Sequence, residues 1–277
     1  MSETPRALVL RTAGTNCDAE LVRAFRLAGC AVELLHVDRL AADPDPIHRA
    51  ELIGFPGGFS YGDDIASGRI LAARLRETLW PALRDAADRG VPMIGICNGF
   101  QVMVQLGLLP GPPSGSDWPT DPITPTVALS ANDSGVFIDR WVGVAPAAGD
   151  RCIWTRGLAE KQAKGEYDPS TMLLPIAHGE GRLVAKDNAV LEALDAGGHI
   201  ALRYTEPVNG SQGDIAGLCD ASGRIFGLMP HPERYLEWTR HPAWTSLDPA
   251  RREGLLTPGR LLFETAVSAV REARIGV

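Results

Sequence analysis

The chain has 277 residues, of which 45% are hydrophobic and 22% are charged, and its formal net charge is -7 at pH 7. This is the composition of an ordinary globular protein, with enough apolar residues to bury a substantial core. The acidic balance argues against broad binding to nucleic acid or to anionic membranes, because phosphate contacts need clustered cations. We find neither a secretory signal pattern nor a run of ~18 apolar residues, and we therefore expect a cytoplasmic protein.

In chain order, the first hundred residues alternate short apolar runs with amphipathic helical patterns. Strands are expected at 7–10, 32–37, 51–55 and 91–96, and helices at 18–28, 69–88 and 98–108. Strands separated by helices indicate βαβ units, and hence a doubly wound, mostly parallel α/β sheet.

The second half of the chain is richer in strand patterns. Residues 110–125 are rich in proline and predict a surface loop. Strand-like runs follow it, namely TVALS, GVFIDRWVGV, RCIWT, LLPIAHGEG, HIALRY, DIAGLC and RIFGLM, and a helix is expected at 259–273. We expect these strands to continue the first sheet, so that residues 1–277 form a single domain.

The cysteines favour thiols over disulfides or a zinc site. There are five, at positions 17, 30, 97, 152 and 219, and no two of them form a CxxC pair. An odd number at wide spacing disfavours both a disulfide framework and a structural zinc site. We expect no bound metal, and mostly buried thiols with room for one that reacts.

Cys97 is the candidate for the reactive thiol. It lies between an apolar strand and a helical pattern, in the run VPMIGICNGFQVMVQLGLL. This is the cysteine version of the nucleophile elbow, in which flanking glycines relieve crowding in a strained turn. The N-terminus of the following helix would stabilise a thiolate and direct N–H groups at an oxyanion. The alternative is a buried structural cysteine at a strand end.

A cysteine nucleophile needs a base, and the base needs a group that orients it. His231 and Glu233 follow a predicted strand in the run IFGLMPHPER, on what the sequence predicts to be an extended stretch. Side chains two positions apart in an extended segment lie on the same side, so Glu233 can orient His231. The alternative is a surface His-Pro-Glu turn. Paired with the elbow, the two side chains predict a Cys-His-Glu triad.

Gly57 and Gly58 belong to a third segment, IGFPGGFSYGDD at 53–64. The segment follows a predicted strand, so it should lie at the same edge of the sheet as Cys97. Paired glycines let backbone N–H groups approach a substrate closely. The segment lacks the Walker pattern, and we do not expect it to bind a nucleotide.

These three segments together resemble the class I glutamine amidotransferases, whose fold is a flavodoxin-like, doubly wound sheet. More narrowly, they resemble the family of glutaminase subunits of phosphoribosylformylglycinamidine synthase, from purine biosynthesis. The matching runs are PGGFSYGD, GICNGFQ and MPHPER, with GTNCD at 14–18, ANDSGVFIDRW at 131–141, AHGEG at 177–181 and NGSQGDIAG at 209–217.

The resemblance implies an activity for each matching residue. Cys97 would attack the side-chain amide of L-glutamine and form a glutamyl thioester, with His231 as acid and base and Glu233 orienting it. Backbone N–H groups near Gly57 and Gly58 and at Asn98 would form the oxyanion hole, and Gln101 would hold the substrate.

The remaining matches carry weaker implications. The resemblance places His178 and Glu180 near the glutamine site in a supporting role, although both could simply form a polar turn. Asn16, Cys17 and Asp18 would shape the site or an interface, or they merely cap the first helix. The 110–125 loop and the 236–256 segment depart from the family pattern, because they are longer than a minimal version of the subunit needs. Their tryptophans would contact a partner or pack these loops down, namely Trp118, Trp238 and Trp244.

The resemblance also implies partners. Ammonia would pass to a large synthase subunit that converts formylglycinamide ribonucleotide to the amidine with ATP and magnesium, with a small accessory subunit in the complex. The chain itself would hold no cofactor. Three alternatives stay open: a class I glutaminase serving a different synthase, a catalytically silent regulatory relative, and a Cys or Ser hydrolase of similar architecture.

Overall fold

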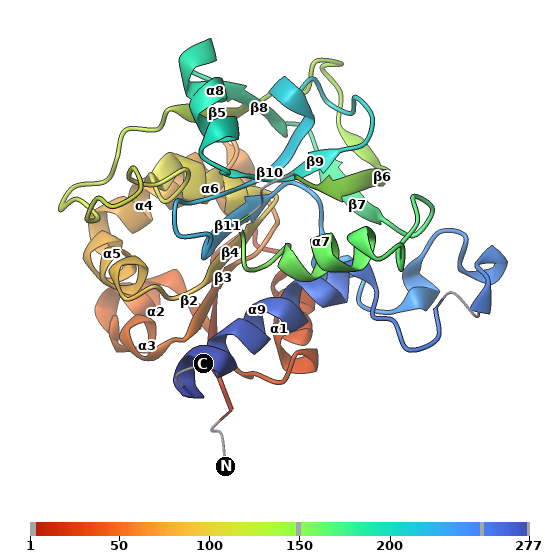
Figure 1. The fold of residues 1–277 in the computed structure, drawn as a ribbon. Coiled ribbons are helices and arrows are strands. Elements are labelled where there is room, and N and C mark those ends of the chain that lie inside the picture. Colours follow the sequence, from red (N-terminus) through yellow and green to blue (C-terminus); the bar gives the residue numbers. More distant parts are fainter. Residues whose placement is uncertain (1–3, 148–150, 250–251, 276–277) are drawn as a thin grey trace.

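The computed structural model describes residues 4–147, 151–249 and 252–275. They form a nine-stranded sheet covered by helices, and strands from both halves of the chain join it (Figure 1). In spatial order the strands are β2 (Ala31–His36), β1 (Arg6–Arg11), β3 (Leu52–Phe55), β4 (Met93–Ile96), β11 (Ile225–Leu228), β10 (Ile215–Cys219), β9 (Ile200–Tyr204), β6 (Ile138–Pro146) and β7 (Leu173–His178).

The sheet has a parallel part and an antiparallel extension. The pairs from β2 through β1, β3 and β4 to β11 are all parallel. The pairs from β11 onward through β10, β9, β6 and β7 are antiparallel. Every residue of β3, β4 and β11 is buried, as expected for central strands covered on both faces. The doubly wound α/β fold predicted from the alternating pattern is thus confirmed.

Helices cover both faces of the sheet (Figure 1). One group, α1 (Asp18–Leu27), α7 (Arg156–Ala163) and α9 (Pro258–Ile275), lies on one face. The other face is covered by α2 (Val37–Ala42), α3 (Asp45–Arg49), α4 (Arg69–Thr78), α5 (Trp80–Asp88) and α6 (Asn98–Leu106). A two-stranded sheet of β5 (Val127–Ser130) and β8 (Arg182–Ala185) lies beside α8 (Asn188–Ala196).

The single helix expected at 69–88 is wrong, because the chain forms two helices there. Leu79 separates α4 from α5, and its φ of -125° is not helical. Pro81 stands in the first turn of α5, where its missing N–H costs nothing. In the interior of a longer helix the same proline would remove a hydrogen bond and clash with the preceding turn.

The strand expected at RCIWT is also wrong, because these residues form turns that lead into α7. Their apolar character has another origin. The Trp154 ring is fully buried and packs edge-on against Phe25 and Phe263, which come from α1 and α9. The run is therefore core packing between helices on one face of the sheet.

Tryptophan side chains pack the 110–125 loop and the 236–256 segment against the rest of the protein. Trp118 packs edge-on against Trp80, with ring centroids 6.3 Å apart, and residues 110–125 contain no helix or strand, as predicted. The Trp238 indole donates to the Leu255 carbonyl at 2.9 Å, whereas Trp244 is 43% exposed. Two of the three tryptophans thus pack loops down.

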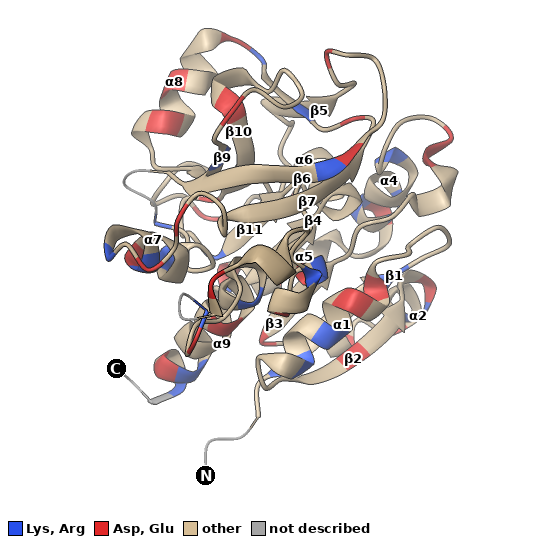
Figure 2. Ribbon diagram, turned by 90° about the vertical axis from the view of Figure 1, so that its right-hand side faces the viewer, with Lys and Arg blue, Asp and Glu red and all other residues tan. Residues whose placement is uncertain are grey.

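Charged side chains lie mainly on the outer helices and loops. Figure 2 shows acidic and basic segments interspersed along α1 and α7, while the interior strands β4 and β11 carry none. No helix among the described residues combines the length and apolar character that crossing a membrane requires.

Candidate active site

Cys97 occupies a strained turn between β4 and α6. Its φ of 52° and ψ of -108° lie outside the regions that side-chain-bearing residues normally adopt. The turn is held by the Cys97 N–H, which donates to the Leu228 carbonyl at 2.8 Å. Gly99 is needed beside it, since a Cβ there would lie 1.9 Å from the Phe55 carbonyl oxygen. The local geometry is that of the predicted nucleophile elbow.

Strand pairing brings His231 to this turn. β11 lies parallel to β4, with Leu228 opposite Ile96. The chain leaves both strands at the same edge of the sheet, one strand leading to Cys97 and its neighbour to His231. The His231 N–H then donates to the Pro175 carbonyl at 2.8 Å, which ties the turn to β7.

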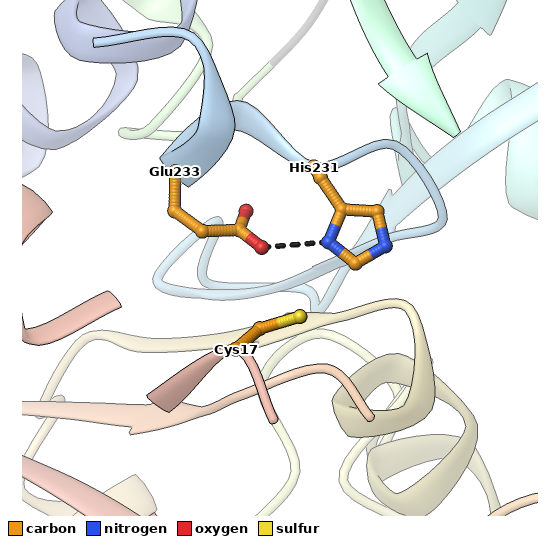
Figure 3. Close-up of side chains that lie close together, drawn as sticks. All are labelled: Cys17, His231 and Glu233. Atoms are coloured by element: carbon orange, nitrogen blue, oxygen red, sulfur yellow. Dashed lines mark hydrogen bonds and ion pairs between the residues drawn. The ribbon is translucent and has the colours of Figure 1, made fainter. Parts of the chain in front are cut away.

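His231 and Glu233 form a buried pair, shown in Figure 3. The imidazole Nδ1 lies 2.6 Å from Oε1 of Glu233, and the two side chains are 2% and 0% exposed. The predicted extended geometry is wrong, because Pro232–Arg234 forms a 3-10 turn. Proline fixes its own φ near -65° and thereby favours this turn. The tight turn, rather than strand alternation, returns the carboxylate to the ring.

This pairing sets the charge of His231. Burial alone would lower the pKa of His231, but the Glu233 carboxylate, and after it the charge of Cys97, raise the pKa well above its ordinary value. A carboxylate acceptor at Nδ1 leaves that nitrogen as the donor. Nε2 has no hydrogen-bond partner among the described residues, and it is therefore available for chemistry in the pocket.

A pocket of about 170 Å³ opens beside the thiol. Its walls come from six separate segments of the chain. They consist of Asn16, Cys17, Gly58, Phe59, Cys97, Phe137, Asp139, Ala177, His231 and Arg234. The Cys97 thiol donates weakly to the Ala177 carbonyl, with 3.7 Å between sulfur and oxygen. The structure thus brings Cys97, His231 and Gly58 together around one small cavity.

Gly57 and Gly58 follow β3 and lie between the first loop and the His231 ring. The Gly57 carbonyl accepts from the Asn16 and Cys17 N–H groups, and a Cβ on Gly57 would lie 2.8 Å from Cε1 of His231. Gly58 forms an antiparallel bridge with Thr15, whose hydrogen bonds are made by the flanking residues. In such a bridge the N–H of the central residue points away from its partner, so the Gly58 N–H is left for the pocket.

Asn98 and Gln101 lie behind the elbow, outside the pocket wall. The Asn98 amide donates to Asp63 at 3.1 Å and to the Gln101 side-chain oxygen at 3.0 Å. The Gln101 amide nitrogen donates to the Glu180 carbonyl. Both ends of the Gln101 side chain are thus occupied by the protein, and its predicted contact with substrate stays a prediction. The Asn98 backbone N–H, at the first position of α6, has no partner within its own helix.

His178 is buried at the end of β7. The Asn132 amide nitrogen donates to two carbonyls, so the oxygen of that amide accepts from His178 Nδ1 at 3.0 Å. Burial, and next the positive charge of His231, lower the pKa of His178 to about 4. The ring is therefore neutral at pH 7, and it supports the wall of the site through Asn132.

Cys17 is a second thiol beside the His–Glu pair (Figure 3). One donor atom from each of Cys17, His231 and Glu233 lies within 4.8 Å of the others, the spacing of possible metal ligands. However, the Arg234 guanidinium already donates to the Cys17 sulfur at 3.0 Å, and the carboxylate is committed to His231. A cation placed there would face the positive guanidinium. We interpret the group as a hydrogen-bonded cluster.

Two charged residues of the pocket were not singled out from the sequence. Asp139 lies near the start of β6 and Arg234 in the turn after Glu233. Both stand in runs that carry the resemblance, ANDSGVFIDRW and MPHPER. Their position in these runs was the available signal, but only the fold places them around the same pocket as Cys97.

Comparisons with known proteins agree with this geometry. Residues 4–269 match the family model of the CobB/CobQ-like glutamine amidotransferase domain. The phosphoribosylformylglycinamidine synthase subunit PurQ of Dehalococcoides mccartyi is 38% identical over 96% of this chain and 98% of the relative. The corresponding subunit of Archaeoglobus fulgidus is 35% identical over 96% and 97%.

Solved structures show the same fold. A chain in the structure of PurLQS from Thermotoga maritima superposes with a TM-score of 0.68 at 31% identity, covering 96% of this chain and 99% of that one. The glutaminase domain of Trypanosoma brucei CTPS with bound acivicin superposes with a TM-score of 0.55 at 14% identity, covering 96% and 94%, a likeness of fold alone.

Proposed function

The chain belongs to the CobB/CobQ-like glutamine amidotransferase domain family, and on this premise we propose that it is the glutaminase subunit of a phosphoribosylformylglycinamidine synthase. It hydrolyses L-glutamine to glutamate and ammonia. The observation that carries the proposal is the Cys97 elbow beside the buried His231–Glu233 pair, with one small pocket between them. The PurQ relatives, similar over nearly their whole length, support the choice of synthase.

In the first half of the reaction, the Cys97 thiolate attacks the side-chain amide carbon of glutamine. The resulting oxyanion accepts hydrogen bonds from the backbone N–H groups of Gly58 and Asn98. Protonated His231 then gives its Nε2 proton to the amide nitrogen, the C–N bond breaks, and ammonia leaves. The raised pKa of His231 suits this step, because the ring is already protonated when the leaving group needs a proton.

In the second half, the neutral His231 accepts a proton from a water molecule that attacks the thioester. The tetrahedral intermediate collapses, glutamate leaves, and the Cys97 thiolate and the His231 imidazolium are restored. Glu233 keeps Nδ1 protonated throughout, so that Nε2 always faces the reacting atoms. His231 supplies the proton that leaves with ammonia and regains one from the attacking water, and the γ-carboxyl proton of the product passes to solvent.

The partners follow from the same proposal. Ammonia passes to a large synthase subunit, which uses ATP and magnesium to convert formylglycinamide ribonucleotide to formylglycinamidine ribonucleotide, and a small accessory subunit completes the complex. The likeness to a chain of the Thermotoga maritima PurLQS structure supports such an assembly. The chain holds no cofactor of its own and works in the cytoplasm. All five cysteines are thiols, which supports a reducing compartment.

The test compares two nitrogen sources for amidine formation. The chain is mixed with the synthase subunits, ATP, magnesium and formylglycinamide ribonucleotide, and product is measured with glutamine or with ammonium chloride. Cys97→Ala should abolish the glutamine-dependent rate and leave the ammonia-dependent rate unchanged. Cys30→Ser is the matched control, because Cys30 precedes β2 at the opposite edge of the sheet, and it should preserve both rates.

Two results would contradict the proposal. Retention of glutamine-dependent product by Cys97→Ala would refute the nucleophile. A wild-type chain that releases ammonia from glutamine, but supports no amidine formation, would refute the synthase and keep the glutaminase.

A further inference from the structure

Two side chains of opposite charge, those of Asp139 and Arg234, line the Cys97 pocket. Asp139 makes no ion pair with any cationic group among residues 4–147, 151–249 and 252–275, and Arg234 makes none with a carboxylate there. The guanidinium of Arg234 has one hydrogen bond, to the sulfur of Cys17 at 3.0 Å. Its sequence neighbour Glu233 is committed to His231.

Unpaired charges on a pocket wall need an explanation. Arg234 is half-buried, and although burial lowers its pKa, the charges of Cys17, Glu233 and Glu20 raise that pKa. Neither carboxylate is within ion-pair distance of the guanidinium, so part of its lost hydration is not replaced by a direct contact with a carboxylate. Asp139 is exposed and loses less. Charges of both signs around one small pocket point to a ligand that brings both complementary charges.

A free α-amino acid is such a ligand. It carries an ammonium and a carboxylate on one carbon atom, and a pocket of about 170 Å³ is small enough to enclose a single amino acid. A guanidinium binds a carboxylate with two parallel hydrogen bonds, and the contact to Cys17 holds the Arg234 guanidinium in place for this.

Resting on the proposed glutaminase function, we propose that Asp139 binds the α-ammonium group and Arg234 the α-carboxylate of glutamine. These two residues then select the amino-acid end of the substrate, while the amide end reaches Cys97. A site built to pair with a charged group rejects an analogue that lacks it, because its own group is left unpaired. The side chains therefore determine specificity and take no part in bond breaking.

The test uses two analogues, each lacking one charge. 5-Amino-5-oxopentanoate lacks the α-ammonium group, and 4-aminobutanamide lacks the α-carboxylate. Ammonia release from glutamine and from each analogue is measured with the complete synthase complex, for the wild type, Asp139→Asn and Arg234→Gln. The matched control is Arg140→Gln, the next residue on β6, which lies outside the pocket and faces Glu206 at 3.8 Å.

We expect each of the two variants to lose discrimination against a different analogue. Asp139→Asn should raise the KM for glutamine about tenfold. It should lose the preference for glutamine over 5-amino-5-oxopentanoate and keep the preference for glutamine over 4-aminobutanamide. Arg234→Gln should raise the KM for glutamine by at least about tenfold. It should lose the preference for glutamine over 4-aminobutanamide and keep the preference for glutamine over 5-amino-5-oxopentanoate. Arg234→Lys should restore the binding of glutamine in part. kcat should change far less than KM, and Arg140→Gln should behave as the wild type. A merely structural role would weaken all substrates alike.

Two outcomes overturn the inference in different ways. If the wild type releases ammonia from glutamine and both variants keep its preferences, or lose both preferences together, this inference fails and the glutaminase stands. If the wild-type complex releases no ammonia from glutamine, the proposed function fails and this inference fails with it.

Discussion

Replacing Glu233 by glutamine should expose how much the buried pair contributes to catalysis and to stability. The substitution keeps the shape of the side chain and removes its charge. His231 then keeps its burial, which lowers its pKa, and loses the carboxylate that does most to raise it. We therefore expect the pKa of His231 to fall, so that the ring is neutral at pH 7 and free to adopt the wrong tautomer.

The magnitude follows from the geometry of the pair. The two groups are 2.6 Å apart and almost completely buried, so solvent screens their interaction little. Removing one partner of a buried pair costs on the order of 3 kcal/mol of stability while the other partner stays charged. Loss of tautomer control in a comparable triad costs about 10⁴-fold in kcat, and we expect a loss of about 10²- to 10⁴-fold here.

The pH dependence of stability gives a signed test. A raised pKa in the folded state stabilises the wild type below the unfolded pKa of about 6.5, and this contribution is lost as pH rises through the folded value. In Glu233→Gln the folded pKa is lowered, and stability is lost as pH falls below about 6.5. Urea unfolding should thus show a larger difference between wild type and variant at pH 6 than at pH 9.

Glu237→Gln is the control, because Glu237 lies four residues further on and pairs with Arg23 at the surface. It should change kcat little and show no such pH dependence. A Glu233→Gln variant with wild-type kcat, or with a stability difference that is the same at both pH values, would refute the reasoning.

Two further substitutions test the packing of the site and of the core. Gly57→Ala places a Cβ 2.8 Å from Cε1 of His231 and should lower kcat by about tenfold or more, whereas at Gly179 the nearest atom would be 3.7 Å away and Gly179→Ala should leave kcat nearly unchanged. Phe263→Ala removes a fully buried ring packed on Phe25 and should lower the free energy of unfolding by about 3–5 kcal/mol in urea titrations, with KM for glutamine unchanged.

The parallel half of the fold could be predicted because its signals are local. Apolar runs of strand length alternate with amphipathic helices, and a glycine-flanked cysteine at a strand–helix junction predicts a strained turn wherever it occurs. The wrong prediction of a single helix at 69–88 also has a local origin. Residues 69–88 keep helical periodicity through Pro81, and periodicity alone cannot place the break between α4 and α5.

Long-range pairing could not be read from the residues themselves. The meeting of Cys97 and His231 depends on β11 lying beside β4, and nothing in either strand specifies that neighbour. The prediction that Cys97 and His231 meet came instead from the resemblance to a family. The extended geometry expected for His231 and Glu233 was wrong although the contact forms, because a 3-10 turn and a strand can both bring such side chains together.

Side-chain partners within the site were the least predictable feature. Gln101 was expected to hold substrate, yet its amide is bonded to Asn98 and Glu180 behind the elbow. Asp139 and Arg234 were overlooked, because a single charge at the start of a strand and another in a turn form no periodic pattern. Their significance depends on their lining the same pocket as Cys97, and only the assembled fold shows that.

The most direct test of the central claim is to trap the covalent intermediate and locate it. The complex is mixed with glutamine, quenched in acid within the first turnover, and digested for mass spectrometry. We predict one glutamyl group in thioester linkage on Cys97, and none in Cys97→Ala. A glutamyl group on Cys17, or ammonia release by the wild type without any thioester on Cys97, would contradict the account.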